Sequence, residues 1–117
     1  EGRLLITERP ERKPYPGYWE FPGGKIEPAE SGYDALVREL REELGIEVTG
    51  AHHCFDHIYT YPDRTVHLAV WIVDTFEGEP SPVENQQLRW STSSEMQQLN
   101  LLDGMWPLLP KISPHFS

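Results

Sequence analysis

The feature that most constrains the fold is an amphipathic helix predicted between Ser31 and Gly45. Ser31 is a residue type that caps helix N-termini, and Asp34 follows three residues later as an acidic partner. Gly45 supplies the left-handed residue that commonly ends a helix. At about 100° per residue, the large apolar side chains between these caps fall on one stripe, which consists of Tyr33, Leu36, Val37, Leu40 and Leu44. We therefore expect the helix to be amphipathic, with this stripe as its apolar face.

Three carboxylates, those of Glu39, Glu42 and Glu43, lie together on nearly the opposite side of the helix. Like charges at these spacings destabilise a helix. One interpretation is a solvated face, on which Arg38 and Arg41 flank the acids and Arg38 pairs with Glu42. The other is a site for a hard cation, because Mg²⁺ binds oxygen ligands and keeps waters that substrate phosphates can replace. The helix alone leaves both interpretations open.

The residues around the helix follow a recognisable spacing. A glycine, five residues, a glutamate and seven residues precede the run Arg-Glu-Leu-Arg-Glu-Glu-Leu-Gly-Ile. This is the spacing of the Nudix box, so the chain resembles the Nudix hydrolases. Its fixed residues all match, and they are Gly24, Glu30, Arg38, Glu39, Glu42, Glu43 and Gly45. At a usage of about 7% for each residue type, such a match arises by chance on the order of once in a hundred million starting points.

The resemblance implies the fold. A Nudix domain is an α/β (α+β) fold in which a mixed β-sheet lies between helices and the box forms a loop-helix-loop. We therefore expect one Nudix domain over residues 1–117. Nudix domains usually have a strand before the first strand of this chain, so we also expect that some N-terminal residues are missing.

The resemblance also implies the reaction, which is Mg²⁺-dependent hydrolysis of a nucleoside triphosphate to a monophosphate and pyrophosphate, with Mn²⁺ as a substitute metal. The expected metal ligands are the carbonyl of Gly23 and the carboxylates of Glu39, Glu42, Glu43 and Glu84. Glu39 is the first choice for the general base, and Glu43 is the alternative. Arg38 and Glu30 are expected to hold the acidic cluster and its loop in place, while Gly24 and Gly45 have structural roles.

The MutT-like group of this family suggests where the substrate binds. The matching positions are Arg9, Glu20, Phe21 and Arg64. From the residues alone, Arg9 is part of a surface loop, Phe21 is an ordinary core aromatic and Arg64 is a solvated turn residue. The resemblance instead favours contacts with the nucleotide.

One position departs from the guanine-specific members of the group. They place an asparagine two residues before the proline that matches Pro107, and this chain has Met105 there. Methionine has no hydrogen-bond donor and only a weak acceptor. Oxidised 8-oxo-dGTP is the leading specific substrate, and CTP, another pyrimidine triphosphate or a nucleoside diphosphate linked to another group are alternatives. A nucleotide-binding module without catalysis is the alternative outside the enzymes.

Composition limits the partners. The net charge of −9 argues against a nucleic-acid polymer or an anionic membrane, but a bound metal would reverse the local sign for a small nucleotide. Cys54 is the single cysteine, so no internal disulfide can form, which fits a reducing cytoplasm. No apolar run approaches the roughly 20 residues that span a bilayer. We therefore expect a cytoplasmic monomer or homodimer.

Apolar runs and turn signals predict the other elements. Strands are expected at residues 4–7, 47–61, 66–76 and 88–90, and the second and third form an antiparallel hairpin around Pro62. Helices are expected at residues 95–99, after a cap among residues 91–94, and at residues 105–112, shortened by its prolines. His52, His53 and Cys54 cannot all point to one side of a strand, which argues against zinc.

Overall fold

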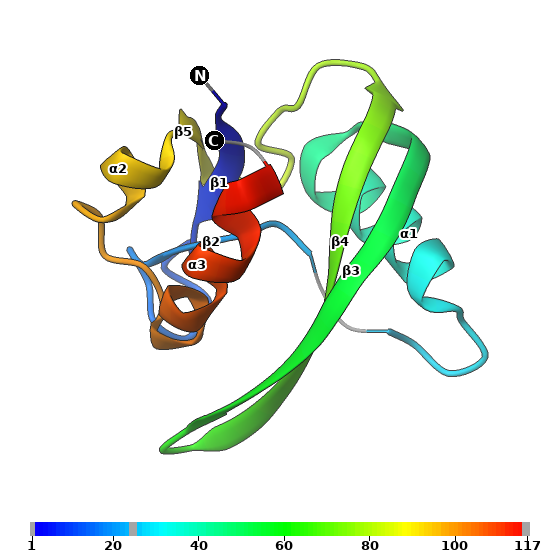
Figure 1. The fold of residues 1–117 in the computed structure, drawn as a ribbon. Coiled ribbons are helices and arrows are strands. Elements are labelled where there is room, and N and C mark those ends of the chain that lie inside the picture. The colour runs from blue at the N-terminus through cyan, green and yellow to red at the C-terminus, as the bar shows by residue number, and fades with distance from the viewer. Residues whose placement is uncertain (1, 24–25, 116–117) are drawn as a thin grey trace. The chain divides into compact units, whose positions relative to one another are not determined.

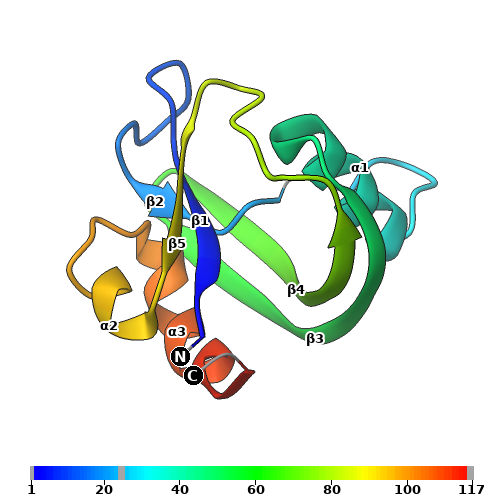
Figure 2. The same ribbon diagram turned by 90° about the horizontal axis from the view of Figure 1, so that it is seen from above.

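The computed structural model describes residues 2–23 and 26–115, and these residues form two compact units. One unit contains the described residues of 1–22 and 85–117, and the other contains those of 23–84. Figure 1 and Figure 2 show the strands and helices of each unit. The single domain predicted from the sequence stays a prediction, and each unit is described by itself.

The first unit is built on a three-stranded sheet with β1 (Leu4–Glu8) at its centre. β1 pairs antiparallel with β2 (Trp19–Glu20) and with β5 (Gln87–Ser91). An isolated parallel bridge joins Trp19 to Leu101, so the described part of this unit has strand pairs of both directions. The predicted strands at residues 4–7 and 88–90 are confirmed, and β1 and β5 extend slightly beyond them.

The helical segments of the first unit are short. They are α2 (Ser93–Met96), a 3₁₀ helix η1 (Asp103–Leu108), α3 (Leu109–Ile112) and a second 3₁₀ helix η2 (Ser113–His115). Thr92 caps α2 in a capping box with Glu95, which confirms a cap among residues 91–94. The helix predicted at residues 95–99 was wrong beyond Met96.

The helix predicted at residues 105–112 is also divided. Pro107 lies inside η1, and proline offers no backbone N–H for an α-helical bond. Tight 3₁₀ turns therefore replace the first part of the predicted helix, and only α3 is α-helical. Met105 is buried, with an exposed fraction of 7%. Most of the fully buried residues belong to this unit, namely Ile6, Ser91, Met96, Leu101 and Leu108.

The second unit contains one long antiparallel hairpin, formed by β3 (Glu47–Tyr61) and β4 (Arg64–Glu77). Tyr61 pairs with Arg64 at the turn, so the predicted hairpin is confirmed. Register shifts interrupt the ladder near Gly50 and between His53 and Phe55. Such bulges increase the local twist of a hairpin, and the twist is plain in Figure 1.

The helix of the second unit is α1 (Gly32–Leu44), and the predicted caps are confirmed. The Ser31 hydroxyl accepts a hydrogen bond of 3.0 Å from the Asp34 N–H. Gly45 has φ +70° and donates its N–H to the Arg41 carbonyl at 3.0 Å. No helix among the described residues is long and apolar enough to cross a membrane.

The apolar stripe of α1 is buried to different degrees along its length. Leu40 and Leu44 are buried, but Leu36 and Val37 are half-buried. Tyr33, also half-buried, meets Trp71 of β4 edge to face with 5.9 Å between ring centroids. The buried residues of the helix also include Glu43 of the acidic face, which is 8% exposed.

Candidate functional site

Arg38 binds several of the predicted site carboxylates within the second unit. Its Nε donates to Glu30 Oε2 at 2.7 Å, and its Nη2 donates to Glu30 Oε1 at 3.1 Å. Its Nη1 donates to Glu39 Oε2 at 3.0 Å and to Glu42 Oε1 at 3.3 Å. We call these four residues the Arg38 network. Because Glu39 and Glu42 share one guanidinium nitrogen, their carboxylates lie near each other beside one cation.

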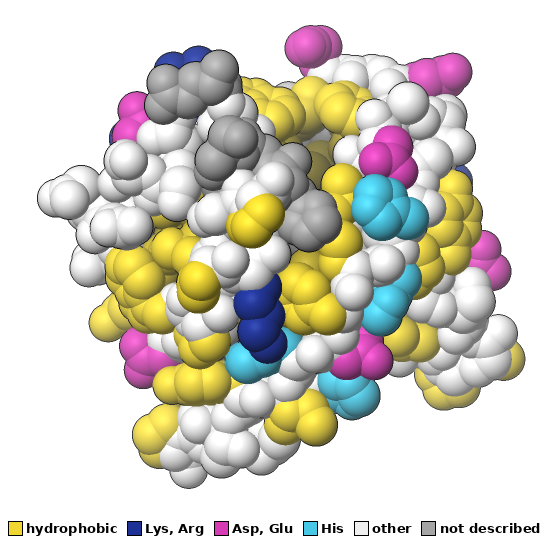
Figure 3. Space-filling view, in the orientation of Figure 1, with side chains coloured by type: hydrophobic (Ala, Val, Ile, Leu, Met, Phe, Trp, Pro, Cys, Tyr) yellow, Lys and Arg dark blue, Asp and Glu magenta, His cyan; other side chains and the backbone are white. Residues whose placement is uncertain are grey.

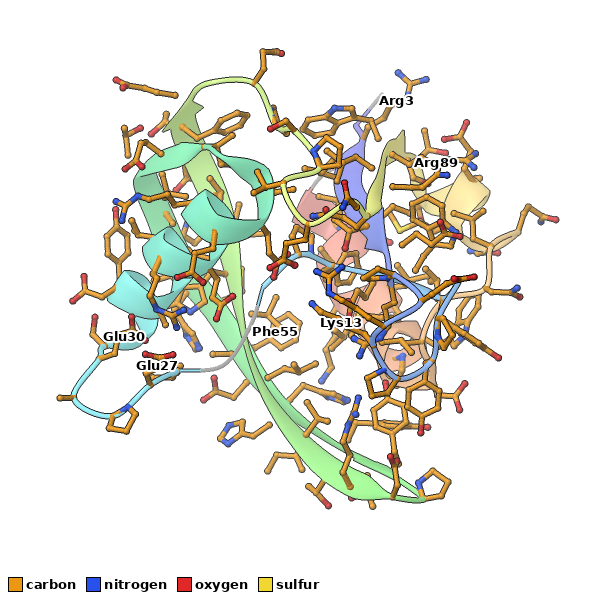
Figure 4. All side chains as sticks on the ribbon, turned by 180° about the vertical axis from the view of Figure 1, so that it is seen from behind. Arg3, Lys13, Glu27, Glu30, Phe55 and Arg89 are labelled. Carbon is orange, nitrogen blue, oxygen red and sulfur yellow. The ribbon has the colours of Figure 1, made fainter. Side chains whose placement is uncertain are left out.

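Glu30 joins this network to the loop before α1. Besides its two bonds from Arg38, Glu30 Oε1 accepts the Glu27 backbone N–H at 3.0 Å. Figure 4 shows Glu27 and Glu30 side by side ahead of α1. The hydrogen bond from Arg38 and then that from Glu27 lower the pKa of Glu30, because both stabilise its ionised form. In turn, the hydrogen bond to Glu30 raises the pKa of Arg38.

Glu43 differs from the other two glutamates of the helix. Its residue is 8% exposed, whereas the Glu42 side chain is 56% exposed. The segment at residues 81–83 lies against this end of α1, where the Ser81 N–H donates to the Leu44 carbonyl at 2.9 Å and the Val83 N–H donates to the Glu43 carbonyl at 3.2 Å. The last carbonyls of a helix need donors from outside it. This segment supplies them, and sequence reasoning missed it.

The same hydrogen bonds bring Glu84 into the neighbourhood of the helix. Glu84 follows Val83, whose backbone is bonded to Glu43, and it is half-buried in a turn. Gly23 has φ +149°, a conformation that favours glycine, and it is exposed. Gly24 lies outside the described residues. The second unit therefore contains all the predicted metal ligands. Glu84 is held near Glu43 because the preceding residue, Val83, donates its N–H to the Glu43 carbonyl.

The donor chemistry of these residues fits a hard divalent cation. The ligands would be carboxylate oxygens, which Mg²⁺ prefers, and two of them already share the Nη1 cation of Arg38. Within the described parts of the chain, no group of three or more His, Cys, Asp or Glu side chains is gathered in an arrangement that could hold a metal ion. Glu39 and Glu42 each accept from Arg38 through one oxygen, so further acceptor positions of both carboxylates stay available to a metal.

Two predicted substrate residues meet in the first unit. Arg9 Nη1 donates to Glu20 Oε1 at 2.9 Å, and Arg9 Nε donates to the Pro14 carbonyl within the loop that follows β1. The Arg9 and Glu20 side chains are only 12% and 22% exposed. Phe21 is half-buried just after β2. In this structure Arg9 thus fixes its own loop, in addition to any role toward a substrate.

Arg64 lies at the start of β4 in the second unit. Its guanidinium carbon is 5.2 Å from the centroid of the Tyr61 ring, within the range of a cation–π contact. The pairing of Tyr61 with Arg64 holds both at the tip of the hairpin. Arg64 is therefore ordered by its own hairpin rather than loosely solvated.

The histidines of the hairpin have separate partners. His52 Nδ1 lies 2.9 Å from Asp74 Oδ2, and His53 Nε2 lies 2.9 Å from Asp56 Oδ1. Both side chains are exposed, and histidine side chains are plainly visible on the surface in Figure 3. These pairs account for the two histidines as ordinary surface residues of the hairpin.

Comparison with known proteins agrees with this geometry. A model of the NUDIX domain family matches residues 1–115. The chain is 43% identical over 109 residues to the CTP pyrophosphohydrolase of Escherichia coli (strain K12), covering 93% of this chain and 81% of that protein. It is also 43% identical over 91 residues to the 8-oxo-dGTP diphosphatase of the same organism, covering 76% of this chain and 69% of that protein.

Solved structures show the same likeness. A MutT structure, from a study of the Aliivibrio salmonicida and Vibrio cholerae proteins, superposes with a TM-score of 0.81 at 32% identity. The superposition covers 98% of this chain and 88% of the other. The predicted Nudix fold is thereby confirmed. With a complete Nudix box in its sequence, the chain belongs to the Nudix hydrolases, among relatives of the MutT type.

Proposed function

We propose that this protein hydrolyses a nucleoside triphosphate to a nucleoside monophosphate and pyrophosphate, with Mg²⁺ as its metal. The observation that carries the proposal is the Arg38 network, in which the arginine of the Nudix box holds three of its glutamates. The two Escherichia coli relatives are a CTP pyrophosphohydrolase and an 8-oxo-dGTP diphosphatase by name. As a class, Nudix hydrolases use divalent metal ions.

The proposed ligands are the carboxylates of Glu39, Glu42, Glu43 and Glu84 with the carbonyl of Gly23. When bound there, a divalent metal neutralises phosphate charge and makes water a better nucleophile. The carboxylates of Glu39 and Glu42 are already fixed by Arg38, and the backbone of Glu43 is fixed by Val83. Fixed groups lose little freedom when a ligand binds, which favours both affinity and rate.

Glu39 is the proposed general base. It takes a proton from the attacking water while the water oxygen bonds to phosphorus, and the bond that links the α-phosphoryl group to pyrophosphate breaks. One oxygen of Glu39 accepts from Arg38. A carboxylate has several acceptor positions, so the others stay available for the proton. Glu43 is the alternative base.

We also propose that the nucleotide is contacted by Arg9, Glu20, Phe21 and Arg64, on less direct support than for the metal ligands. Arg9 and Glu20 already bind each other, so they contact a substrate through their remaining donors and acceptors. Oxidised guanine and pyrimidine triphosphates are both candidate substrates, and the relative named for CTP matches over more of this chain than the one named for 8-oxo-dGTP. The cytoplasmic location and the monomeric or dimeric state also stay predictions.

The test is pyrophosphate release in the presence of Mg²⁺ across normal and oxidised nucleoside triphosphates, compared as kcat/KM. We expect release from at least one of them and none after chelation of the metal. Products other than a monophosphate and pyrophosphate would contradict the proposed bond cleavage. Tight nucleotide binding without turnover would indicate a binding module instead.

A further inference from the structure

The segment that follows β4 is attached to the end of α1 by two backbone hydrogen bonds. The Ser81 N–H donates to the Leu44 carbonyl at 2.9 Å, and the Val83 N–H donates to the Glu43 carbonyl at 3.2 Å. The Ser81 hydroxyl also donates to the Leu44 carbonyl, at 3.3 Å. We call residues 79–84 the 79–84 segment, and Figure 1 shows it as the yellow-green loop after β4. It supplies donors for carbonyls that an α-helix cannot satisfy by itself.

The sequence of the 79–84 segment suits this attachment. Pro80 and Pro82 alternate with the two donors, so the residues without an N–H fall at positions where α1 requires none. Proline also holds φ at about −65° and restricts the residue before it to extended conformations. The Val83 N–H is shared with the Ser81 carbonyl at 2.9 Å, which closes a γ-turn around Pro82. The segment is therefore restricted by its own residues as well as by α1.

Glu84 follows directly after the second attachment. It is half-buried, and it is the last residue of the second unit. Val83 thus holds the chain to α1 just before the chain continues into the first unit. The residue of α1 at this attachment is Glu43, whose carboxylate is itself a proposed metal ligand. The backbone of Glu84 is therefore tied to the helix that carries the other carboxylate ligands.

We propose that Val83 is a positioning residue for the metal site, and this rests on the proposed function. Among the described residues, the acidic side chains are not gathered into a group that could hold a metal, so what Val83 fixes is the backbone from which Glu84 reaches. The Glu84 carboxylate then reaches the metal mainly by rotation of its own side chain. Ordering a backbone costs free energy, and the attachment supplies this order before the metal arrives. Val83 contributes no ligand atom and acts through Glu84.

Removal of one N–H tests the proposal. Val83→Pro removes the donor, whereas Val83→Ala keeps it and truncates a side chain that is 55% exposed. The measurement is the binding of Mn²⁺ alone, followed by the electron paramagnetic resonance of the free ion, so it does not depend on activity. We expect Val83→Pro to weaken Mn²⁺ binding about tenfold, the lower end of what groups that orient metal ligands contribute. Val83→Ala should bind Mn²⁺ as wild type does.

A double-mutant cycle with Glu84→Gln shows whether Val83 acts through Glu84. Glu84→Gln alone should weaken Mn²⁺ binding, and Val83→Pro should have little further effect in that background, because residues that act together are not additive. A loss from Val83→Pro that is equal in both backgrounds would overturn the proposal, since Val83 would then act through α1 alone. Unchanged Mn²⁺ binding in Val83→Pro or in Glu84→Gln would overturn it as well.

Amide hydrogen exchange of the wild type tests the same link if Val83→Pro does not fold. If the attached segment binds the metal better, the metal must in turn favour the attached segment. Mg²⁺ should therefore slow the exchange of the Val83 N–H in wild type and slow it much less in Glu84→Gln. Exchange of this amide that does not respond to Mg²⁺ in wild type would contradict the positioning role.

The proposed function and the positioning role fail in different ways. Absence of pyrophosphate release from every triphosphate, with the Mn²⁺ cycle as expected, would overturn the proposed function and leave the role of Val83 standing. Pyrophosphate release together with additive effects of Val83→Pro and Glu84→Gln would do the reverse.

Discussion

Two regions of this molecule differ in how their polar groups are satisfied. In the Arg38 network, each carboxylate is already bound to one guanidinium. Where the end of β1 pairs with the start of β5, within the described part of the chain, the side chains of Glu8 and Gln87 have no such partner. Groups that bind each other are held in place, and their remaining acceptor positions stay available to a metal. Groups without such partners are hydrogen-bonded by water instead, since Gln87 is exposed and Glu8 is half-buried.

This contrast predicts different consequences for the same kind of substitution. A change in the Arg38 network should affect rate, metal binding and stability together. A change at Glu8 or Gln87, neither of which is a proposed metal ligand, should affect these quantities little. The following predictions test the first region at decreasing size of effect.

The largest effect is expected for Glu43→Gln. The substitution keeps the size of a buried side chain and removes its negative charge, so it removes a proposed metal ligand. We expect kcat to fall by about 10²–10⁴-fold, the range of a lost acid–base or metal group, while the melting temperature changes little. Steady-state kinetics and a thermal melt measure both quantities.

Glu47→Gln is the control for that experiment. Glu47 is half-exposed and binds Arg41 rather than the metal site, so its loss should leave kcat unchanged. Equal activity of wild type and Glu43→Gln would contradict the assignment of Glu43. Equal losses in both variants would mean that the helix as a whole had been disturbed.

A smaller effect is expected for Arg38→Lys. Lysine keeps the charge but lacks the planar fork that bonds Glu30 twice and reaches Glu39 and Glu42 as well. Groups that orient metal ligands typically contribute about 10–100-fold in metal affinity or activity. We therefore expect a loss of this size, together with a higher Mg²⁺ concentration for half-maximal rate.

Arg41→Lys is the matched variant. Arg41 lies on the same helix, and its guanidinium donates to Glu47 and, among the described residues, to no carboxylate of the Arg38 network. It should have normal kinetics. If Arg38→Lys behaved in the same way, the Arg38 network would be a surface feature, which is the solvated-face interpretation of the sequence.

Local signals explain what the sequence could predict. The caps of α1 lie within a few residues of the groups that they bind, and the hairpin follows from two strand-like runs around one turn. Both depend on neighbours along the chain. The fixed spacing of the Nudix box adds the identity of the site, because it specifies residue types at each position.

The missed features depend on contacts between distant parts of the chain. Val83 bonds to the Glu43 backbone, and the burial of Glu43 could not be read from the helical pattern, which placed it on the acidic face. The pairing of Glu8 with Gln87 requires the register of β1 with β5. The division of the helix predicted at residues 105–112 has a local cause, because Pro107 in the sequence already indicated that this helix would be shortened. Only the length of the 3₁₀ segment was not predicted.

Mg²⁺ should stabilise the folded protein. A ligand at about one hundred times its Kd adds about 2.7 kcal/mol to the free energy of unfolding, and each kcal/mol raises the melting temperature by a few degrees in a domain of this size. A rise of several degrees in wild type and a smaller one in Glu42→Gln are expected in thermal melts at constant ionic strength. A melting temperature that does not respond to Mg²⁺ would contradict the site.

The smallest effect is expected from the pH dependence of Glu30. Because Arg38 and the Glu27 N–H lower its pKa below the ordinary value of 4.5, the folded state binds a proton at Glu30 more weakly than the unfolded state does. Glu30 therefore contributes stability that is present above pH 4.5 and is lost as the pH falls through its lowered pKa. Glu30→Gln should be less stable than wild type near neutral pH, and the difference should shrink on acidification. Denaturant midpoints from about pH 7 to about pH 3 would show this. Glu79→Gln is the control, because Glu79 is exposed and its loss should leave the pH dependence of stability as in wild type. An NMR titration that placed the pKa of Glu30 at or above its ordinary value would remove the argument that Glu30 orders the loop.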